Sequence, residues 1–216
     1  MEIEILFLDP HIVVCLKPSG VASEEEGMPT LLRETQGGEF YCVHRLDKAV
    51  GGVMVYTRTK QAAAALSAAI AAGGMKKEYL AVVQGAPDER KGSMRDLLYH
   101  DAVRNKSYIV TRPRRGVKEA LLDYELTETK EIEGRTISAL RIALHTGRSH
   151  QIRVQLASRG MPLVGDGRYG SAIRGCPVAL WSERLRFAHP VGGEELCFSA
   201  PPPESFPWDR FSLHNA

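Results

Sequence analysis

The chain has 216 residues, of which 44% are hydrophobic and 25% are charged, and its formal net charge is +2. This composition is that of an ordinary globular protein with enough residues for a sizeable core, so it excludes a disordered chain. The net charge alone gives no argument for a nucleic-acid partner, and no apolar run approaches the roughly 18 residues of a membrane-spanning helix.

Apolar runs bounded by Gly, Pro, Asn and Asp predict β-strands along most of the chain. The expected strands cover residues 3–8, 11–16, 53–57, 75–83, 120–129, 135–144, 178–187 and 196–199. The expected helices cover residues 30–37, 60–72, 149–159 and 204–213, with Ser149 as the N-cap of the third. We expect short strands and loops over residues 88–118. The interspersed strands favour an α/β protein of the α+β type, a mixed and largely antiparallel sheet flanked by helices. Residues 1–216 are expected to form a single domain.

The four cysteines lack C-x-x-C spacing, which gives no indication of a zinc ribbon or a disulfide framework. The N-terminal residues show no signal peptide. We therefore expect a cytoplasmic protein with reduced thiols.

Positive charge gathers in two segments without acids. Residues 102–118 contain six Lys or Arg residues, and residues 134–165 contain five Arg and two His residues. Such segments can bind phosphates, although two solvated loops would explain them equally well. The first segment contains the adjacent pair Arg114 and Arg115, which are candidates for phosphate contacts.

A highly charged stretch, His44-Arg45-Leu46-Asp47-Lys48, lies at a turn between two apolar runs. Further along, Thr146 to Arg153 reads as the start of a helix, where Arg148 would help to attract an anion. A buried Arg153 requires a carboxylate partner, and Asp47 is the natural candidate.

These segments, taken in order, resemble the motifs of the RluA family of pseudouridine synthases, and the similarity runs from about residue 3 to 206. The matching motifs are Lys17-Pro18-Ser19-Gly20, His44 to Lys48, Lys77 to Ala81, Thr146 to Ala157, Gly165-Asp166 with Tyr169-Gly170, and His189-Pro190.

The resemblance implies isomerisation of uridine to pseudouridine in ribosomal or transfer RNA, without a metal or an organic cofactor. Asp47 matches the family nucleophile, which attacks either C1′ of the ribose or C6 of the base. Tyr79 matches the active-site tyrosine that stacks on the uracil, and Arg153 is assigned as the partner of Asp47. Arg45 matches the arginine that fills the gap left by a flipped uridine.

The remaining residues of these motifs receive supporting roles. His44 and Arg148 are grouped with Arg45 on the RNA side, and His44 and His150 are expected to be hydrogen-bonded scaffold residues. Asp166 is expected to form a turn in a glycine-rich loop.

The chain departs from the family pattern at two places. Relatives usually have Asp-Thr-Ser-Gly where this chain has Ala49-Val50-Gly51-Gly52, and often Leu-His-Ala where it has Leu180-Trp181-Ser182. We also expect no added N-terminal RNA-binding module, and a monomer is the default.

Two alternatives stay open at this point. One is an RNA-binding or ribosome-assembly protein with the same fold and reduced or lost catalysis, which the altered stretch at 49–51 motivates. The other is a metal-dependent hydrolase using His44, Asp47 and His150, which the absence of a tight ligand pattern disfavours.

Overall fold

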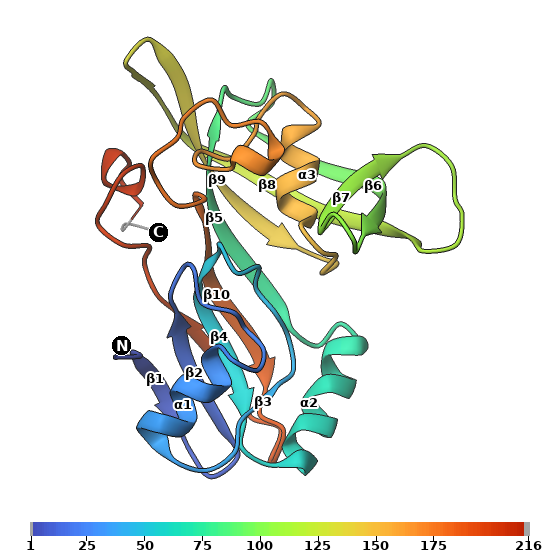
Figure 1. Cartoon of the computed structure of the whole chain (residues 1–216), viewed down its shortest axis with the longest axis vertical. Helices are drawn as coiled ribbons and strands as arrows, with labels where there is room; N and C mark the ends of the chain where they lie inside the picture. The colour runs from blue at the N-terminus through green and yellow to red at the C-terminus, as the bar shows by residue number, and fades with distance from the viewer. Residues whose placement is uncertain (1, 214–216) are drawn as a thin grey trace. The chain divides into compact units, whose positions relative to one another are not determined.

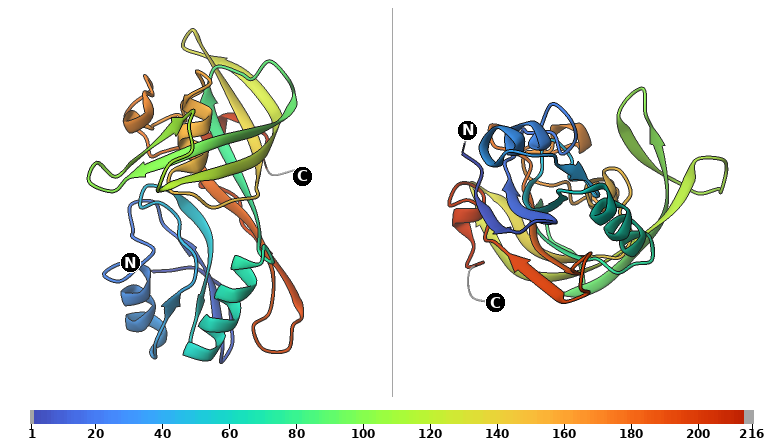
Figure 2. Two further views of the ribbon diagram at one scale, coloured as in Figure 1. Left: turned by 90° about the vertical axis from the view of Figure 1, so that its right-hand side faces the viewer. Right: turned by 90° about the horizontal axis from the view of Figure 1, so that it is seen from below.

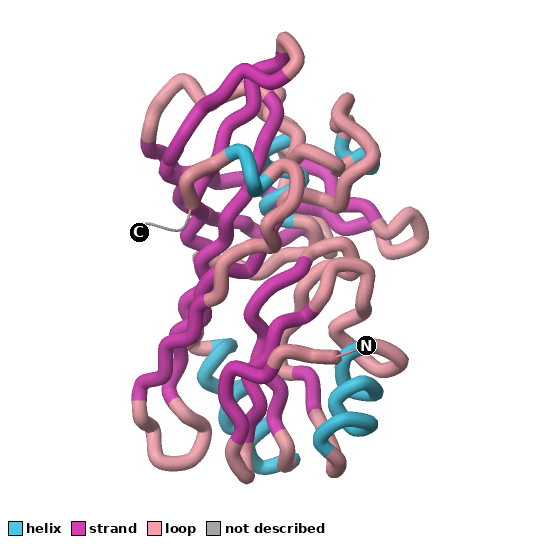
Figure 3. Tube along the Cα trace, turned by 90° about the vertical axis from the view of Figure 1, so that its left-hand side faces the viewer, coloured by secondary structure: helices cyan, strands magenta, loops and turns pink. Residues whose placement is uncertain are grey.

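The computed structural model describes residues 2–213, which form two compact units. The first unit contains Met1–Lys77 and Trp181–Pro201, and the second contains Glu78–Leu180 and Pro202–Ala216. Strands are the main element of both units, and helices accompany them (Figure 3). The predicted fold class, a mixed and largely antiparallel sheet with flanking helices, is confirmed.

The strands of the first unit are ordered β1-β2-β4-β10, with β3 paired to β4 and β11 paired to β10. Only the β4–β10 pair is parallel among these. Helix α2 packs beside β3 and β4 (Figure 1). The elements are β1 (Ile5–Leu8), β2 (Ile12–Lys17), α1 (Met28–Gln36), β3 (Tyr41–Cys42), β4 (Gly51–Thr57), α2 (Lys60–Ala71), β10 (Leu180–Ala188) and β11 (Glu195–Ser199).

The glycine pair at the start of β4 lets β10 approach closely. Gly52 has φ +124°, and a Cβ built there would lie 2.4 Å from the carbonyl oxygen of Ser182. A Cβ on Gly51 would lie 2.5 Å from the Trp181 ring. Any other residue at Gly52 would collide with the Ser182 backbone and force the two strands apart, whereas a side chain at Gly51 would require the Trp181 ring to move.

The strands of the second unit are ordered β5-β9-β8-β6-β7. Helix α3 packs against β6, β7 and η1. The loop after the β6–β7 hairpin extends away from the rest of this unit (Figure 2), whereas the hairpin itself packs against α3. The elements are β5 (Lys76–Gln84), β6 (Lys91–Asp101), β7 (Lys106–Val110), β8 (Val117–Ile132), β9 (Arg135–Leu144), α3 (Gln151–Ala157), η1 (Gly167–Tyr169) and η2 (Trp208–Arg210), the last two being 3-10 turns.

Most predicted elements are present, but three expectations were wrong. Residues 88–118 contain an eleven-residue strand, β6, and not only short strands. Its polar residues are held by cross-strand ion pairs, such as Lys91 to Glu125 at 3.1 Å and Arg95 to Glu119 at 2.8 Å, which an apolar pattern cannot reveal.

The ends of two predicted helices also differ. The N-cap of α3 is His150, with φ +53°, and not Ser149. The expected helix over residues 204–213 is replaced by the single turn η2, because Pro207 lacks the N–H that a continuous helix needs.

Candidate active site

Asp47 lies in a tight turn between β3 and β4, and its backbone is held on both sides. The Asp47 carbonyl accepts a hydrogen bond from the Val50 N–H at 2.9 Å. The neighbouring Leu46 is buried, and the Ser23 hydroxyl both accepts from the Leu46 N–H (3.0 Å) and donates to the Leu46 carbonyl (2.8 Å). The half-buried Asp47 side chain is therefore presented by a backbone with little freedom.

The loop Lys17-Pro18-Ser19-Gly20 forms hydrogen bonds with the other side of this turn. The Gly20 N–H donates to the Lys48 carbonyl at 2.7 Å, and the Ser19 hydroxyl donates to the Ala49 carbonyl at 2.7 Å. Gly20 has φ +90°, a conformation that favours glycine. Two motifs about 30 residues apart in sequence thus form one rigid structure around Asp47.

Lys17 is completely buried within that structure. Its ammonium donates to the carbonyls of Pro18 (3.0 Å), Val21 (2.7 Å) and Lys48 (3.4 Å). Burial lowers the pKa of Lys17 to about 8, and the negative charge of Asp47 opposes this shift. The buried Lys17 ammonium therefore interacts electrostatically with the Asp47 carboxylate.

His44 and Arg45, on the same loop, have different environments. His44 is buried, its Nε2 accepts from the Val55 N–H at 3.2 Å, and burial lowers its pKa well below the ordinary value, with Lys77 adding to the effect. The neutral ring is a scaffold residue, and a direct contact of His44 with RNA stays a prediction. The Arg45 side chain is 61% exposed and its Nη1 lies 3.1 Å from a carboxylate oxygen of Glu24.

Arg153, in α3 of the second unit, is 5% exposed and forms a two-pronged ion pair with Asp166. The Arg153 Nε lies 2.7 Å from Oδ2 of Asp166, and Nη2 lies 2.9 Å from Oδ1. The guanidinium also lies 5.1 Å from the centre of the Tyr169 ring. Asp166 is thus a fixed partner of Arg153, and its glycine-rich context had suggested only a turn.

The other predicted residues of the second unit differ in burial. Tyr79 lies in β5 and is 4% exposed. Arg148 donates from Nε to the Glu119 carbonyl at 2.8 Å. Arg114 and Arg115 are exposed in the loop between β7 and β8, and the Arg114 guanidinium lies 4.6 Å from the centre of the Tyr99 ring.

Asp47, His44 and Arg45 belong to the first unit, whereas Tyr79, Arg148 and Arg153 belong to the second. That Asp47, Tyr79 and Arg153 meet at one site stays a prediction, as do their individual roles.

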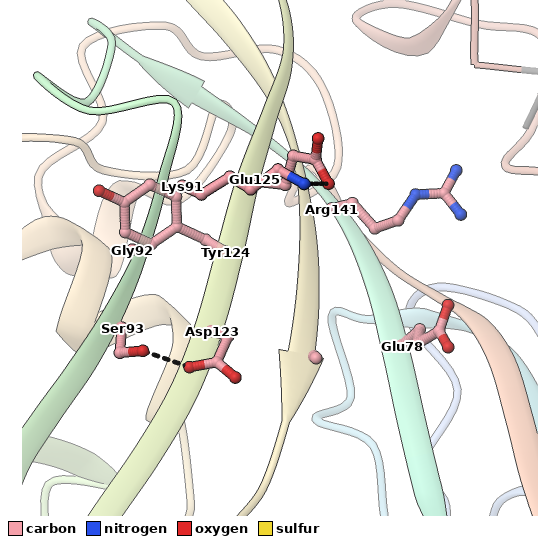
Figure 4. Close-up of a pocket in the computed structure, with 9 residues that line it drawn as sticks. Glu78, Lys91, Gly92, Ser93, Asp123, Tyr124, Glu125 and Arg141 are labelled. Atoms are coloured by element: carbon pink, nitrogen blue, oxygen red, sulfur yellow. Dashed lines mark hydrogen bonds and ion pairs between the residues drawn. The ribbon is translucent and has the colours of Figure 1, made fainter.

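An open groove of about 440 Å³ runs across β5, β6, β8 and β9 (Figure 4). Its lining contains three carboxylates (Glu78, Asp123 and Glu125) against two cations (Lys91 and Arg141). Ser93 donates a hydrogen bond to Asp123, and Lys91 pairs with Glu125. Because adjacent residues of a strand point to opposite faces, Glu78 places this groove on the sheet face opposite to Tyr79. Its excess of negative charge does not fit a phosphate backbone.

Within residues 2–213, no cluster of three or more His, Cys, Asp or Glu side chains is placed to hold a metal ion. No helix in this range has the length and apolar content to cross a bilayer.

The two departures from the family pattern meet in the first unit. Gly51 stands where relatives usually have serine, and Trp181 stands where they often have histidine. A Cβ on Gly51 would collide with the Trp181 ring, whose Nε1 donates to the Ala200 carbonyl at 2.9 Å. The larger ring at 181 therefore occupies the space that the smaller residue at 51 leaves.

Lys17, Asp166 and Tyr169 had no catalytic or binding role assigned from the sequence, and Asp166 was expected only to form a turn. Lys17 belonged to a recognised motif, but nothing in its spacing indicated a buried ammonium near Asp47. Asp166 and Tyr169 lay in another motif, and their contacts with Arg153 depend on how the loop folds back onto α3.

Comparison with known proteins gives a consistent result. A family model described as RNA pseudouridylate synthase matches residues 11–158. Ribosomal large subunit pseudouridine synthase D of Xanthomonas campestris pv. campestris is 35% identical over 233 aligned positions, covering 94% of this chain and 67% of that protein. Dual-specificity RNA pseudouridine synthase RluA of Escherichia coli is 33% identical over 210 positions, covering 91% of this chain and 92% of that protein.

Among solved structures, Human RNA Pseudouridylate Synthase Domain Containing 1 has the same fold. The TM-score is 0.81 at 24% identity, and the match covers 94% of this chain and 85% of that one. With the ordered motifs and the matched length, the chain belongs to the RluA family of RNA pseudouridine synthases.

Proposed function

We propose that this protein isomerises specific uridines to pseudouridine in ribosomal or transfer RNA, with the Asp47 carboxylate as nucleophile. The observation that carries the proposal is the turn around Asp47, held by Ser23 and Ser19 and influenced by the buried Lys17 ammonium. A catalytic carboxylate needs this kind of fixed backbone and favourable charge.

The proposed reaction needs no second reactant. The bond between N1 of the uracil and C1′ of the ribose breaks, and a bond between C5 and C1′ forms. The proton on C5 leaves and N1 gains a proton, so atoms and electrons balance within the nucleoside. Asp47 forms a transient bond to the substrate, and Tyr79 is the group that we expect to stack on the ring.

Arg45 is the residue that we expect to occupy the space of the flipped uridine. Flipping costs a few kcal/mol of stacking. A guanidinium can stack on the neighbouring bases and pair with a phosphate at the same time. The exposed ion pair with Glu24 is weak enough to be exchanged for such contacts.

The acid-free segment 102–118 is the proposed RNA-binding surface, with Arg114 and Arg115 at its centre. Both side chains are exposed on the loop after β7. Basic side chains without neighbouring acids supply the sequence-independent part of RNA affinity. The Xanthomonas relative is named for the large ribosomal subunit, which favours ribosomal RNA as the substrate of this chain.

A second candidate is an RNA-binding or ribosome-assembly protein that has reduced or lost catalysis. The replacement of two hydroxyl-bearing residues near Asp47 by Val50 and Gly51 favours it. The hydrogen bonds from Ser19 and Ser23 favour the enzyme, because they hold the turn without those hydroxyls.

Incubation with RNA labelled with tritium at C5 of uracil separates these functions. Release of tritium in the presence of a chelator supports the synthase. Salt-sensitive RNA binding without release supports the assembly protein, and chelator-sensitive cleavage would point to a hydrolase.

The four free cysteines agree with the cytoplasmic location that we propose.

A further inference from the structure

We propose that Tyr169 is a positioning residue that fixes Arg153 relative to the β6–β7 hairpin. This inference rests on the proposed function, in which Arg153 supports the nucleophile and the hairpin belongs to the RNA-binding surface. Nothing in the sequence had assigned a role to Tyr169.

The Tyr169 hydroxyl joins two separate elements. It accepts a hydrogen bond from the backbone N–H of Ser107, in β7, at 2.8 Å. It also lies 2.9 Å from Nδ1 of His150, the N-cap of α3, and 3.3 Å from the Ser107 carbonyl. The hydroxyl donates to the Ser107 carbonyl, and its role toward His150 depends on the tautomer of the imidazole ring. One oxygen atom therefore connects the hairpin to the start of the helix that carries Arg153.

The Tyr169 ring contacts two cations from the same two elements. The Arg153 guanidinium lies 5.1 Å from the ring centre, and the Lys106 ammonium lies 5.3 Å from it. Cations within about 6 Å of an aromatic ring are attracted to its face, and more strongly when they are buried, as Arg153 is. A rotation of the ring would disturb both contacts.

The residues beside Tyr169 strengthen the connection. Asp166 binds Arg153 through two nitrogen atoms. Arg168 donates from Nη1 to the carbonyls of Arg104 (3.0 Å) and Asn105 (3.1 Å), at the tip of the hairpin. Asp166 thus binds Arg153, Arg168 binds the β6–β7 hairpin, and Tyr169 contacts both.

The hairpin itself is fastened to α3 by a second route. The Ser107 hydroxyl donates to the Ser149 carbonyl at 2.5 Å, and it lies 3.1 Å from Nδ1 of His100. Because this route is independent of Tyr169, loss of the Tyr169 hydroxyl should leave the hairpin in place. The expected consequence is a loosened Arg153 with an intact RNA-binding surface.

The test compares Tyr169→Phe with Tyr124→Phe in the full chain. Tyr124 lies in β8 of the same unit and lines the acidic groove, whereas the Arg153 contact belongs to Tyr169. Single-turnover pseudouridine formation at saturating RNA, RNA affinity and thermal melting are measured for each variant. Tyr169→Leu, which also removes the ring, gives a stronger second variant.

We expect Tyr169→Phe to lower the single-turnover rate by about tenfold, and Tyr169→Leu by about 100-fold, as for a misplaced catalytic group. RNA affinity should change by less than about twofold, since the phosphate contacts are untouched. Tyr124→Phe should resemble the wild type. A normal rate for Tyr169→Phe, or a loss of affinity with a normal rate at saturation, overturns the proposal.

A spectroscopic measurement separates this inference from the proposed function. Exchange of the Arg153 Nε proton with solvent is followed by NMR in the wild type and in Tyr169→Phe. Faster exchange in the variant supports the positioning role whether or not the wild type forms pseudouridine, and unchanged exchange overturns it. If the wild type formed pseudouridine in no RNA, the proposed function would be refuted and the positioning role would not.

Discussion

Lys17 and Asp47 form a pair in which a fully buried ammonium interacts with a half-buried carboxylate. The ammonium is satisfied by backbone carbonyls, including that of Lys48 directly after Asp47. Because burial lowers the pKa of Lys17 to about 8, this cation can lose its proton near neutral pH. The positive charge that interacts with Asp47 is therefore sensitive to pH.

The first prediction is a fall in the pseudouridylation rate as the pH rises through about 8. Deprotonation of Lys17 removes a positive charge near Asp47 and a donor to the Lys48 carbonyl. In Lys17→Arg the guanidinium stays charged, so the residual activity should be flat across this range. Lys77→Arg is the control, because burial lowers the pKa of Lys77 to about 8 as well.

The stability of the folded protein, in contrast to the rate, should increase with pH in this range. The pKa of Lys17 is about 8 in the folded protein, against an ordinary value of 10.5. Between these values the unfolded chain binds more protons, so the contribution of Lys17 to the free energy of unfolding increases with pH. A falling rate in a protein that remains folded would support the assignment. A decrease in the rate near pH 8 that persists in Lys17→Arg and disappears in Lys77→Arg would refute the assignment to Lys17.

The second prediction concerns the contact between Gly51 and Trp181. Gly51→Ser restores the usual family residue but drives its side chain into the Trp181 ring. Overpacking of this kind costs about 1–3 kcal/mol in the free energy of unfolding. In Trp181→His the ring is smaller, so Gly51→Ser should then cost much less. A double-mutant cycle by urea unfolding measures the difference, which we expect to exceed about 1 kcal/mol. Additive effects would show that the two departures are independent.

Much of this protein could be predicted from its sequence, because local patterns were strong where the core lies. Helix α2 was predicted within one residue from its alanine-rich run. Strand β6 was underestimated because Met94 and Leu98 are its only buried residues, and its contacts with β8 include exposed ion pairs.

Side-chain partners were harder to predict than elements. The sequence indicated that a buried Arg153 needs a carboxylate, yet Asp166 provides two of its hydrogen bonds. Both residues were in recognised motifs, 13 positions apart. Only the fold of the glycine-rich loop brings Asp166 to the guanidinium, and no periodicity encodes such a loop.

The third prediction is that Glu24→Gln increases RNA affinity by about two- to fivefold. Glu24 neutralises Arg45 in an exposed pair, and such pairs contribute less than about 1 kcal/mol. Glu25→Gln is the matched control, because it removes the same charge from the next residue, whose partner is Arg33. Equal gains in both variants would show a general charge effect and remove Arg45 from the argument.

The fourth prediction is that the double variant Arg114→Ala, Arg115→Ala weakens binding to all RNA sequences. The dependence of log affinity on log salt concentration should become shallower by about 1.5, as expected for two lost phosphate contacts. The control removes two other exposed arginines, Arg186 and Arg210, each of which already pairs with an acid. An unchanged salt dependence in the first variant would exclude the loop after β7 from the RNA-binding surface.

The most direct test of the account is pseudouridine formation by Asp47→Asn on an RNA that the wild type modifies. Asparagine keeps the shape of the side chain, and the turn is held mainly through backbone groups, so folding and RNA affinity should remain close to wild type. The account predicts no detectable pseudouridine even after prolonged incubation, because the amide is not a nucleophile. Substantial pseudouridine formed by a purified, correctly folded Asp47→Asn protein would contradict it.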